Sequence, residues 1–171
     1  MKNTAEKNGA KAYFKSDGKK LAALVYKPQN FNLENTYPAL VVTRPASGVK
    51  EQTAGLYAQE FAKRGFITLV FDPKGFGESE GRTRVEDVYS IISDTKNAVS
   101  FLENIEGVDK SNIFNIGICM GSAYATIASI EDSRIKATGV ISPILTNPED
   151  AAKVYGSRFF LWGMLNSMKP I

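Results

Sequence analysis

The chain has 171 residues, of which 43% are hydrophobic and 23% are charged, proportions that are typical of one globular domain. The formal net charge is only +3 and no run of Lys or Arg occurs, which argues against a nucleic-acid-binding surface. Histidine is absent, which excludes the usual general base near neutral pH and any histidine-containing metal site, so we expect no metal and no other cofactor.

The compartment is inferred from what the sequence lacks. Its single cysteine, Cys119, cannot form an internal disulfide, so a reducing compartment is the simpler expectation. Residues 1–9 lack the apolar core of a secretory signal, and no uninterrupted apolar run is long enough to cross a bilayer. We therefore expect a cytoplasmic protein that binds neither a membrane nor a nucleic acid.

The first regular pattern lies in residues 11–27 and predicts an antiparallel β-hairpin. Two alternating segments flank Asp17-Gly18, a pair that supplies the backbone angles of a tight turn. Two short, continuous apolar runs follow at residues 39–43 and 66–71, and each is typical of a strand that is buried on both faces.

Helical patterns accompany these strands. Residues 50–64 predict a helix that ends at Gly65. Its apolar side is expected to carry Leu56, Ala58, Phe61 and Ala62. A longer helix is predicted over residues 85–104. Its buried face is expected to carry Val88, Ile91, Ile92, Thr95, Val99 and Leu102.

The alternation of strand and helix then repeats. Residues 113–117 predict a strand, residues 120–131 a helix rich in small residues, and residues 136–142 a further strand. This alternation indicates an α/β fold, in which helices flank a mostly parallel sheet and right-handed crossovers join the strands.

The motif Gly117-Ile118-Cys119-Met120-Gly121 follows a predicted buried strand and opens a predicted helix. It is a G-x-C-x-G pattern, with cysteine where G-x-S-x-G enzymes have a serine nucleophile on a sharp strand-to-helix turn, and its glycines allow the close approach. The positive helix end would favour the thiolate, and the Met120 amide would be one oxyanion donor. A buried cysteine that acts as a small apolar residue is the alternative interpretation.

Three segments together resemble the α/β-hydrolase superfamily, in the branch that is similar to dienelactone hydrolase. They are residues 44–55, residues 71–81, and the motif with its following residues at 117–124. The resemblance extends over residues 11–142. It implies an α/β-hydrolase core that acts on an ester, thioester or lactone, with Cys119 as the nucleophile.

The resemblance also implies roles for residues around the motif. The backbone amide of Ala46 would be the second oxyanion donor, in a loop where relatives often carry histidine at the position of Arg44. Residues 71–81 resemble the family's D-x-R-G-x-G-x-S segment, which shapes the site wall and does not supply the catalytic acid. Asp72 is therefore expected to be structural and to bind nearby loop amides.

The partners of the nucleophile are not visible. In this fold an acid and then a histidine follow the nucleophile along the chain. The acids after Cys119 are Glu131, Asp132, Glu149 and Asp150, and none follows a predicted later strand. Because no base is visible, we expect weak or absent turnover from these residues alone.

Three parts are expected: a flexible N-terminus at residues 1–10, a partial α/β-hydrolase core at 11–147, and the start of a cap segment or a tail helix at 148–171. The resemblance implies that the family's sheet continues beyond the strand at 136–142, so the core is expected to be truncated after the strand that follows the nucleophile helix. The exposed edge of that strand, or the apolar tail at 148–169, is expected to offer a surface for self-association.

Three interpretations of function stay open at this point. The chain is a hydrolase that acts on a small-molecule acyl substrate, a non-catalytic binding or assembly module derived from a hydrolase, or a fragment of a longer enzyme. One fold hosts many chemistries, so the substrate cannot be named from the fold.

Overall fold

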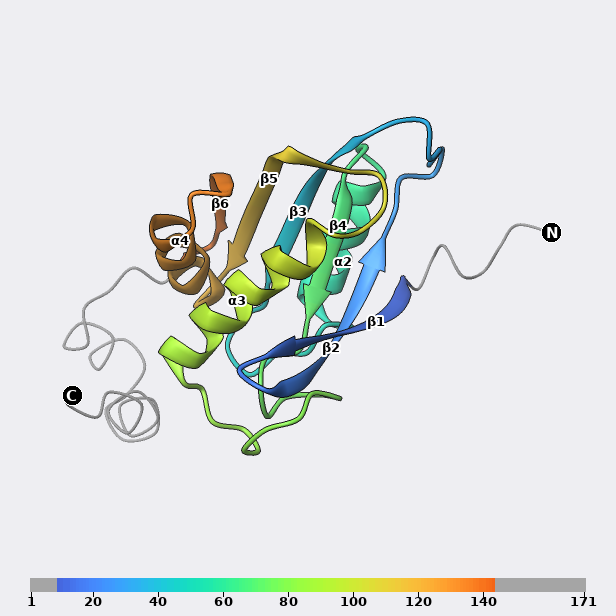
Figure 1. The fold of residues 1–171 in the computed structure, drawn as a ribbon. Coiled ribbons are helices and arrows are strands. Elements are labelled where there is room, and N and C mark those ends of the chain that lie inside the picture. Colours follow the sequence, from blue (N-terminus) through green and yellow to red (C-terminus); the bar gives the residue numbers. More distant parts are fainter. Residues whose placement is uncertain (1–8, 144–171) are drawn as a thin grey trace.

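The computed structural model describes residues 9–143 of the chain. They form a six-stranded sheet in the order β1-β2-β4-β3-β5-β6, with helices against both of its faces (Figure 1). This is the predicted α/β architecture, in which a mostly parallel sheet begins with an antiparallel hairpin.

The predicted hairpin is confirmed as β1 (Ala10–Ser16) and β2 (Lys19–Tyr26). Asp17 and Gly18 form its turn with φ values of 46° and 77°, and positive φ at both central residues suits the twist of a two-residue hairpin. β2 also pairs antiparallel with β4, and this pairing joins the hairpin to the rest of the sheet.

The other strands run parallel to one another: β3 (Tyr37–Thr43), β4 (Ile67–Phe71), β5 (Val108–Ile118) and β6 (Ile135–Ile141). β3 lies between β4 and β5 at the centre of the sheet. β5 begins well before the predicted position at residue 113, because Val108 pairs with Tyr37 of β3. A register shift separates this pair from the next one, Ala39 with Ile113, and most of the side chains between Val108 and Ile113 are exposed.

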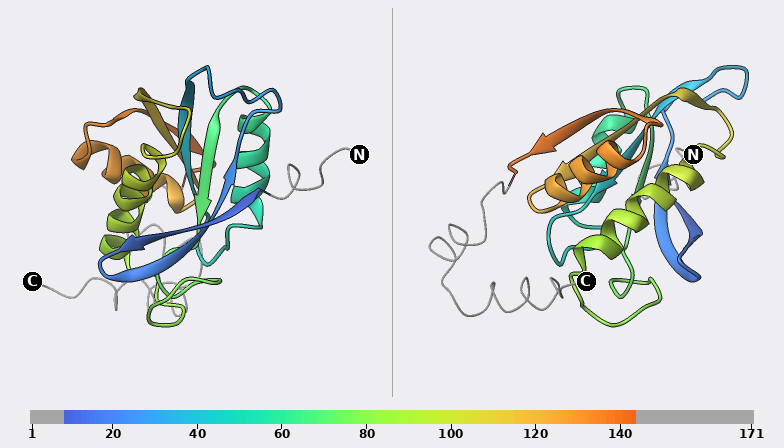
Figure 2. Two further views of the ribbon diagram at one scale, coloured as in Figure 1. Left: turned by 45° about the vertical axis from the view of Figure 1, so that its right-hand side comes forward. Right: turned by 60° about the vertical axis from the view of Figure 1, so that its left-hand side comes forward.

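Three helices cover the sheet: α2 (Thr53–Ala62) on one face, and α3 (Val88–Leu102) and α4 (Gly121–Glu131) on the other (Figure 2). Each is slightly shorter than its predicted range. α3 begins where Asp87 caps it, since the Asp87 side chain accepts a hydrogen bond of 3.0 Å from the amide of Ser90.

The prediction that Leu56 lies on the buried side of α2 is wrong. The side chain of Leu56 is 62% exposed, and small residues face the sheet in its place. These residues are Ala54, Gly55, Ala58 and Ala62. A Cβ atom on Gly55 would overlap the backbone of Lys50, and the larger Tyr57 and Phe61 pack against the same cluster while only partly buried.

Two hydrophobic clusters lie on the two faces of the sheet. Val41 and Val42 are adjacent on β3 and fully buried, yet they belong to different clusters. Val41 packs with residues of α3 such as Ile91, and Val42 packs with residues of α2 such as Ala58. The continuous apolar run of β3 therefore follows from burial on both faces.

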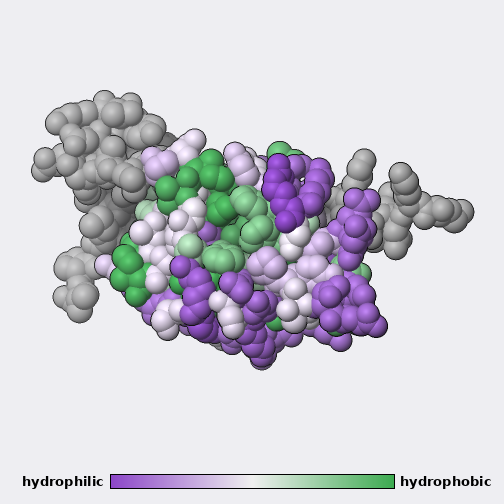
Figure 3. Space-filling view, turned by 90° about the horizontal axis from the view of Figure 1, so that it is seen from above, coloured by the Kyte–Doolittle hydropathy of each residue, from purple (hydrophilic) through white to green (hydrophobic). Residues whose placement is uncertain are grey.

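The surface combines hydrophobic and charged areas. In the view of Figure 3, hydrophobic residues gather in one part of the face and hydrophilic residues border it. Within residues 9–143 no helix is long and apolar enough to cross a membrane. The predicted tail helix at 148–169 lies outside the described residues, and so do most of the N-terminal segment and the last residues of the predicted core.

Candidate active site at the β5–α4 turn

Cys119 lies at the turn between β5, which ends at Ile118, and α4, which begins at Gly121. Its φ is +57°, a left-handed conformation that costs a residue with a side chain roughly 1–2 kcal/mol. The Cys119 amide donates a hydrogen bond of 2.9 Å to the carbonyl of Ile141 on β6, and the Cys119 carbonyl accepts one of 3.1 Å from Ser122. Both sides of the turn are therefore fixed to the framework.

The two glycines of the motif allow this turn to pack tightly. A Cβ atom on Gly117 would lie 2.5 Å from the carbonyl carbon of Gly121, and a Cβ atom on Gly121 would lie 2.5 Å from the carbonyl oxygen of Thr43. Real Cβ atoms do not approach other atoms so closely. The start of α4 thus packs directly on the ends of β3 and β5, which a larger residue at either position would prevent.

The backbone amides of Met120 and Ala46 are the two expected oxyanion donors. In the part of the chain that the structure describes, neither amide donates a hydrogen bond to another protein group. Thr43, after which the Ala46 loop begins, is paired with Gly117 in the sheet, so that loop and the Cys119 turn leave neighbouring strand ends. An oxyanion hole requires two amides of this kind and, in addition, that both point at one position.

The thiol of Cys119 is neither fully exposed nor fully buried. Cys119 contacts the hydrophobic clusters on both faces of the sheet, and Ala46 contacts one of them. The side chain thus combines partial access to solvent with apolar surroundings at the first residues of a helix.

A cluster of polar side chains beside the turn was not predicted from the sequence. Arg44 is 1% exposed, and its guanidinium forms a bidentate ion pair with Glu86 at 2.8 and 3.1 Å. The same carboxylate accepts hydrogen bonds of 3.2 Å from the Ser47 amide and of 3.2 Å from the Tyr124 hydroxyl. Arg44 also lies over the ring of Phe76, with its guanidinium carbon 4.2 Å from the ring centroid.

The sequence held only an indirect signal for this cluster. Arg44 follows a buried strand, and a buried charge needs a partner. That partner, Glu86, is 42 residues away along the chain, so no local pattern reveals it. Burial, and then the charge of Glu86, raise the pKa of Tyr124 above its usual value, which keeps its hydroxyl protonated as a donor.

Asp72 is fully buried and binds neighbouring loops. Its Oδ1 accepts a hydrogen bond of 2.8 Å from the Lys50 amide, and its Oδ2 accepts one of 3.0 Å from the Glu78 amide. Oδ2 also lies 2.8 Å from the Lys50 ammonium, which pairs in addition with Glu51 and Glu78. Asp72 thus connects the segment after β3 to the segment after β4.

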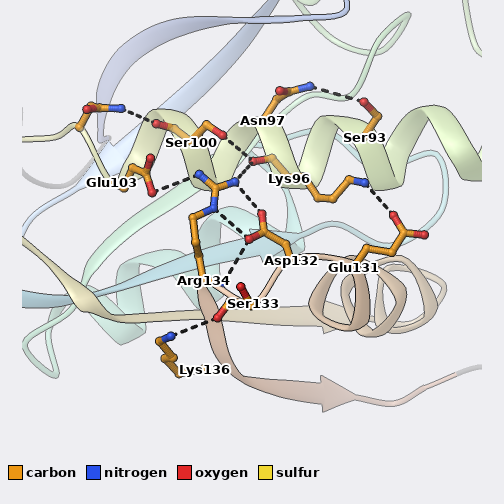
Figure 4. Close-up of polar contacts among 11 residues, drawn as sticks. Ser93, Lys96, Asn97, Ser100, Glu103, Glu131, Asp132, Ser133, Arg134 and Lys136 are labelled. Carbon is orange, nitrogen blue, oxygen red and sulfur yellow. Dashed lines mark hydrogen bonds and ion pairs between the residues drawn. The ribbon is translucent and has the colours of Figure 1, made fainter.

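Two of the acids that follow the nucleophile lie at the opposite end of α4 (Figure 4). Glu131 pairs with Lys96 on α3 at 2.7 Å, and Asp132 pairs with Arg134 at 2.6 Å. The hydrogen bond from Arg134 lowers the pKa of Asp132. An eleven-residue helix is about 16 Å long, so neither carboxylate is near Cys119. Glu149 and Asp150 lie outside the described residues.

Metal ligands do not gather in residues 9–143. The structure shows no group of three or more Cys, Asp or Glu side chains there that would hold a metal ion. The candidate groups described above are the Cys119 thiol, the two backbone amides and the cluster around Glu86.

This chain is similar in sequence to a known protein family and to several known proteins. Residues 47–169 match the family model Hydrolase_4, described as serine aminopeptidase, S33. The uncharacterized protein YcjY of Escherichia coli (strain K12) is 40% identical over 125 residues, which cover 72% of this chain and 41% of that protein. The thiohydrolase aneE of Aspergillus aculeatus is 34% identical over 146 residues, which cover 84% of this chain and 44% of that protein.

Solved structures agree with these matches. The crystal structure of the hypothetical protein PA2218 from Pseudomonas aeruginosa has a TM-score of 0.79 and 35% identity, and it covers 92% of this chain and 49% of that one. An α/β hydrolase that is 22% identical has a TM-score of 0.73, which shows the shared fold. The chain spans less than half the length of these curated relatives and of PA2218.

Proposed function

We propose, because this chain belongs to the α/β-hydrolase family of the Hydrolase_4 (serine aminopeptidase, S33) model, that it carries the nucleophile and oxyanion hole of a hydrolase for carbonyl esters, thioesters or lactones. In this proposal Cys119 is the nucleophile, and the turn that holds it is a nucleophile elbow. The amides of Met120 and Ala46 bind the oxyanion, and the substrate is a small acyl compound.

The backbone of Cys119 is the observation that carries the proposal. A residue with a side chain is held at a φ of +57° between two glycines whose neighbours leave no room for a Cβ atom. Strain of this kind persists only where the surrounding structure enforces it, and it gathers at functional sites. A purely structural cysteine needs no such turn.

The chemistry follows from this geometry. Cys119 loses its proton to solvent, and the thiolate at the start of α4 is stabilised by the positive end of the helix. Sulfur attacks the carbonyl carbon, and the carbonyl electrons move to the oxygen, where the Met120 and Ala46 amides stabilise the negative charge. When the carbonyl re-forms, the alkoxide or thiolate leaves and takes a proton from water. Hydrolysis of the acyl-Cys119 thioester then releases the acid and restores the thiol.

The relatives support a hydrolase over a non-catalytic module. One of them bears the name thiohydrolase, and we take thioesters as the first substrate class to test for this reason. We place the chain near enzymes that resemble dienelactone hydrolase because residues 44–55, 71–81 and 117–124 together resemble that branch.

The test is covalent trapping on the 171-residue chain. The protein is incubated with an activated ester, p-nitrophenyl acetate, and with an acyl thioester of N-acetylcysteamine, and the mass of the intact protein and its peptides is measured. We expect one acyl group per chain, on the peptide that contains Cys119. Cys119→Ala is expected to remain unlabelled, while Ser142→Ala, which changes another residue at positive φ, is expected to label normally.

Two results would contradict the proposal. One is a wild-type chain that reacts with iodoacetamide at Cys119 but accepts no acyl group from either probe. The other is an acyl group that appears to the same extent on Cys119→Ala, since the acceptor would then be a different residue.

A further inference from the structure

The two proposed oxyanion donors lie on separate segments of the chain. Ala46 lies in the loop after β3, and Met120 lies at the start of α4. An oxyanion hole works only when both amides face one point, so something must fix the loop relative to the helix. The side chain of Glu86, which belongs to neither segment, contacts both.

On the loop side, Glu86 holds the residues on either side of Ala46. Its carboxylate accepts two hydrogen bonds from the Arg44 guanidinium, at 2.8 and 3.1 Å, and one from the Ser47 amide at 3.2 Å. Arg44 donates in addition to the carbonyl of Pro45 at 2.8 Å. Arg44, Pro45 and Ser47 are thus all connected to one carboxylate, and Ala46 lies between them.

The loop does not hold this shape through local contacts alone. Ser47 has a φ of 58°, which is unfavourable for a residue with a side chain. The amide of Gly48 donates to the carbonyl of Pro45 at 3.1 Å, and this single turn contact is the other hydrogen bond that closes the loop. The Glu86 carboxylate compensates for the strain at Ser47 by accepting from its amide.

On the helix side, Glu86 accepts a hydrogen bond of 3.2 Å from the Tyr124 hydroxyl. Tyr124 is 1% exposed and lies about one helical turn after Met120, so its position is rigidly related to that of the Met120 amide. Burial raises the pKa of Tyr124, so the hydroxyl donates to the carboxylate at any physiological pH. The carboxylate is 19% exposed, which places it between the surface and the core.

The geometry points to Glu86 as the positioning residue of the oxyanion hole: it fixes the Ala46 loop against the first turn of α4 and so sets where the two donor amides meet. This inference rests on the proposed function, because it assigns Glu86 a role in that same site. Glu86 acts through the two backbone segments and does not itself contact the reacting carbonyl.

Glu86→Gln is the informative variant. The Arg44, Ser47 and Tyr124 groups around the carboxylate all donate to it in the structure, so the amide group of glutamine must face at least one donor. We expect acylation of Cys119 by p-nitrophenyl acetate to slow about 10- to 100-fold, with little change in the ester concentration that gives half the maximal rate. Glu131→Gln, at the far end of α4, is the matched control and is expected to acylate normally.

Alkylation by iodoacetamide separates positioning from general damage. That reaction displaces iodide at a saturated carbon and develops no oxyanion, so it reports only the access and nucleophilicity of the thiol. We expect the Glu86→Gln chain to alkylate Cys119 at the wild-type rate while it acylates slowly. Hydrogen exchange of the Ser47 amide should become faster, because the group of hydrogen bonds that fixes the loop is weakened in either orientation of the glutamine.

The outcomes distinguish this inference from the proposed function. If wild-type protein acylates and Glu86→Gln acylates equally fast, the positioning role is wrong and the proposed function stands. If the wild-type chain alkylates but never acylates, both are wrong. If Glu86→Gln does not fold, Tyr124→Phe removes only the helix-side contact, and an acylation rate equal to the wild type for that variant would overturn the inference.

Discussion

Gly121, at the start of α4, lies against Thr43, at the end of β3, so closely that a Cβ atom on the glycine would lie 2.5 Å from the threonine carbonyl oxygen. This contact brings the Cys119 turn next to the loop that carries Ala46. It is a backbone-to-backbone contact, which no change of side-chain rotamer relieves. We therefore expect Gly121→Ala to push the helix away from the sheet.

The cost of Gly121→Ala should be about 1–3 kcal/mol of unfolding free energy, the usual range for overpacking, measured by urea denaturation. Acylation of Cys119 should fall further than stability alone explains, because the Met120 amide moves with the helix. Gly18→Ala is the matched control: nothing lies within 4 Å of the added Cβ atom, and only its φ of +77° is unfavourable. If the control slows acylation as much as Gly121→Ala, the contact with Thr43 is not what positions the turn.

The buried pair of Lys50 and Asp72 predicts a large loss of stability when one charge is removed. In the wild type both oxygens of the Asp72 carboxylate accept hydrogen bonds, from backbone amides and from the Lys50 ammonium. Asp72→Asn replaces one of these two oxygens with an NH₂ group. A buried donor would then face another donor, and Lys50, which is 1% exposed, would lose its buried partner. We expect a loss of about 3 kcal/mol by urea denaturation.

Glu60→Gln is the comparison for Asp72→Asn. Glu60 pairs with Lys63 and Arg64 on the surface, where solvent screens the charges, so no measurable loss is expected. Equal losses of unfolding free energy for the two variants would show that the buried Lys50–Asp72 pair stabilises the fold no more than the surface pairs of Glu60.

Glu78 predicts a dependence of stability on acid pH. Its hydrogen bonds to Lys50 and then Lys11 lower the pKa of the Glu78 carboxyl from 4.5 to about 2. A carboxyl whose pKa is lower in the folded state contributes stability above its unfolded pKa, and that contribution is lost as pH falls toward the folded pKa. Wild-type protein should thus exceed Glu78→Gln in unfolding free energy at neutral pH, and the difference should shrink from pH 4.5 toward pH 2.

Urea titrations of both chains across that pH range measure the difference. Lys11→Met removes one of the two cations and so raises the folded pKa of Glu78 toward its unfolded value. The loss of stability should therefore be smaller than in the wild type and should be complete at a higher pH. A difference between wild type and Glu78→Gln that stays constant from neutral pH down through pH 4.5 and below would contradict the role of this carboxylate.

The features that the sequence predicted well all depend on local patterns. The hairpin at Asp17-Gly18 follows from turn chemistry, and the strands at residues 39–43 and 66–71 follow from continuous apolar runs. The Cys119 turn combined both kinds of signal, since glycines flank it and a buried strand precedes it. Each of these signals lies within about ten residues of the feature that it predicts.

The features that were missed depend on contacts between distant segments. Leu56 was placed in the core by periodicity, but it is exposed, and the residues of α2 that are buried are Ala54, Gly55, Ala58 and Ala62. The first residues of β5 are mostly exposed and gave no apolar pattern, although the strand begins where Val108 pairs with Tyr37 of β3. Glu86 lies between two predicted elements, and only the folded chain shows that it contacts both Arg44 and Tyr124.

The absence of histidine predicts how far the reaction proceeds in the 171-residue chain. Attack by a thiolate needs no base, whereas hydrolysis of the acyl thioester needs a group that activates water, and lack of such a group slows that step about 10²- to 10⁴-fold. With p-nitrophenyl acetate we expect a burst of p-nitrophenolate that equals the Cys119 content, followed by a much slower release. Cys119→Ser should give no burst, because a hydroxyl at the same place stays protonated.

Hydroxylamine distinguishes a Cys119 thioester that hydrolyses slowly from a protein that has lost its reactive thiol permanently. It attacks thioesters readily without a general base, so its addition after the burst should release the acyl group as a hydroxamate. Because hydroxylamine also cleaves p-nitrophenyl acetate directly, it is removed before fresh ester is added, and a second burst of the same size is then expected. The amplitude of the second burst measures how many thiols were regenerated. Steady-state release as fast as the burst, without hydroxylamine, would show that a residue of this chain other than histidine activates water beside Cys119.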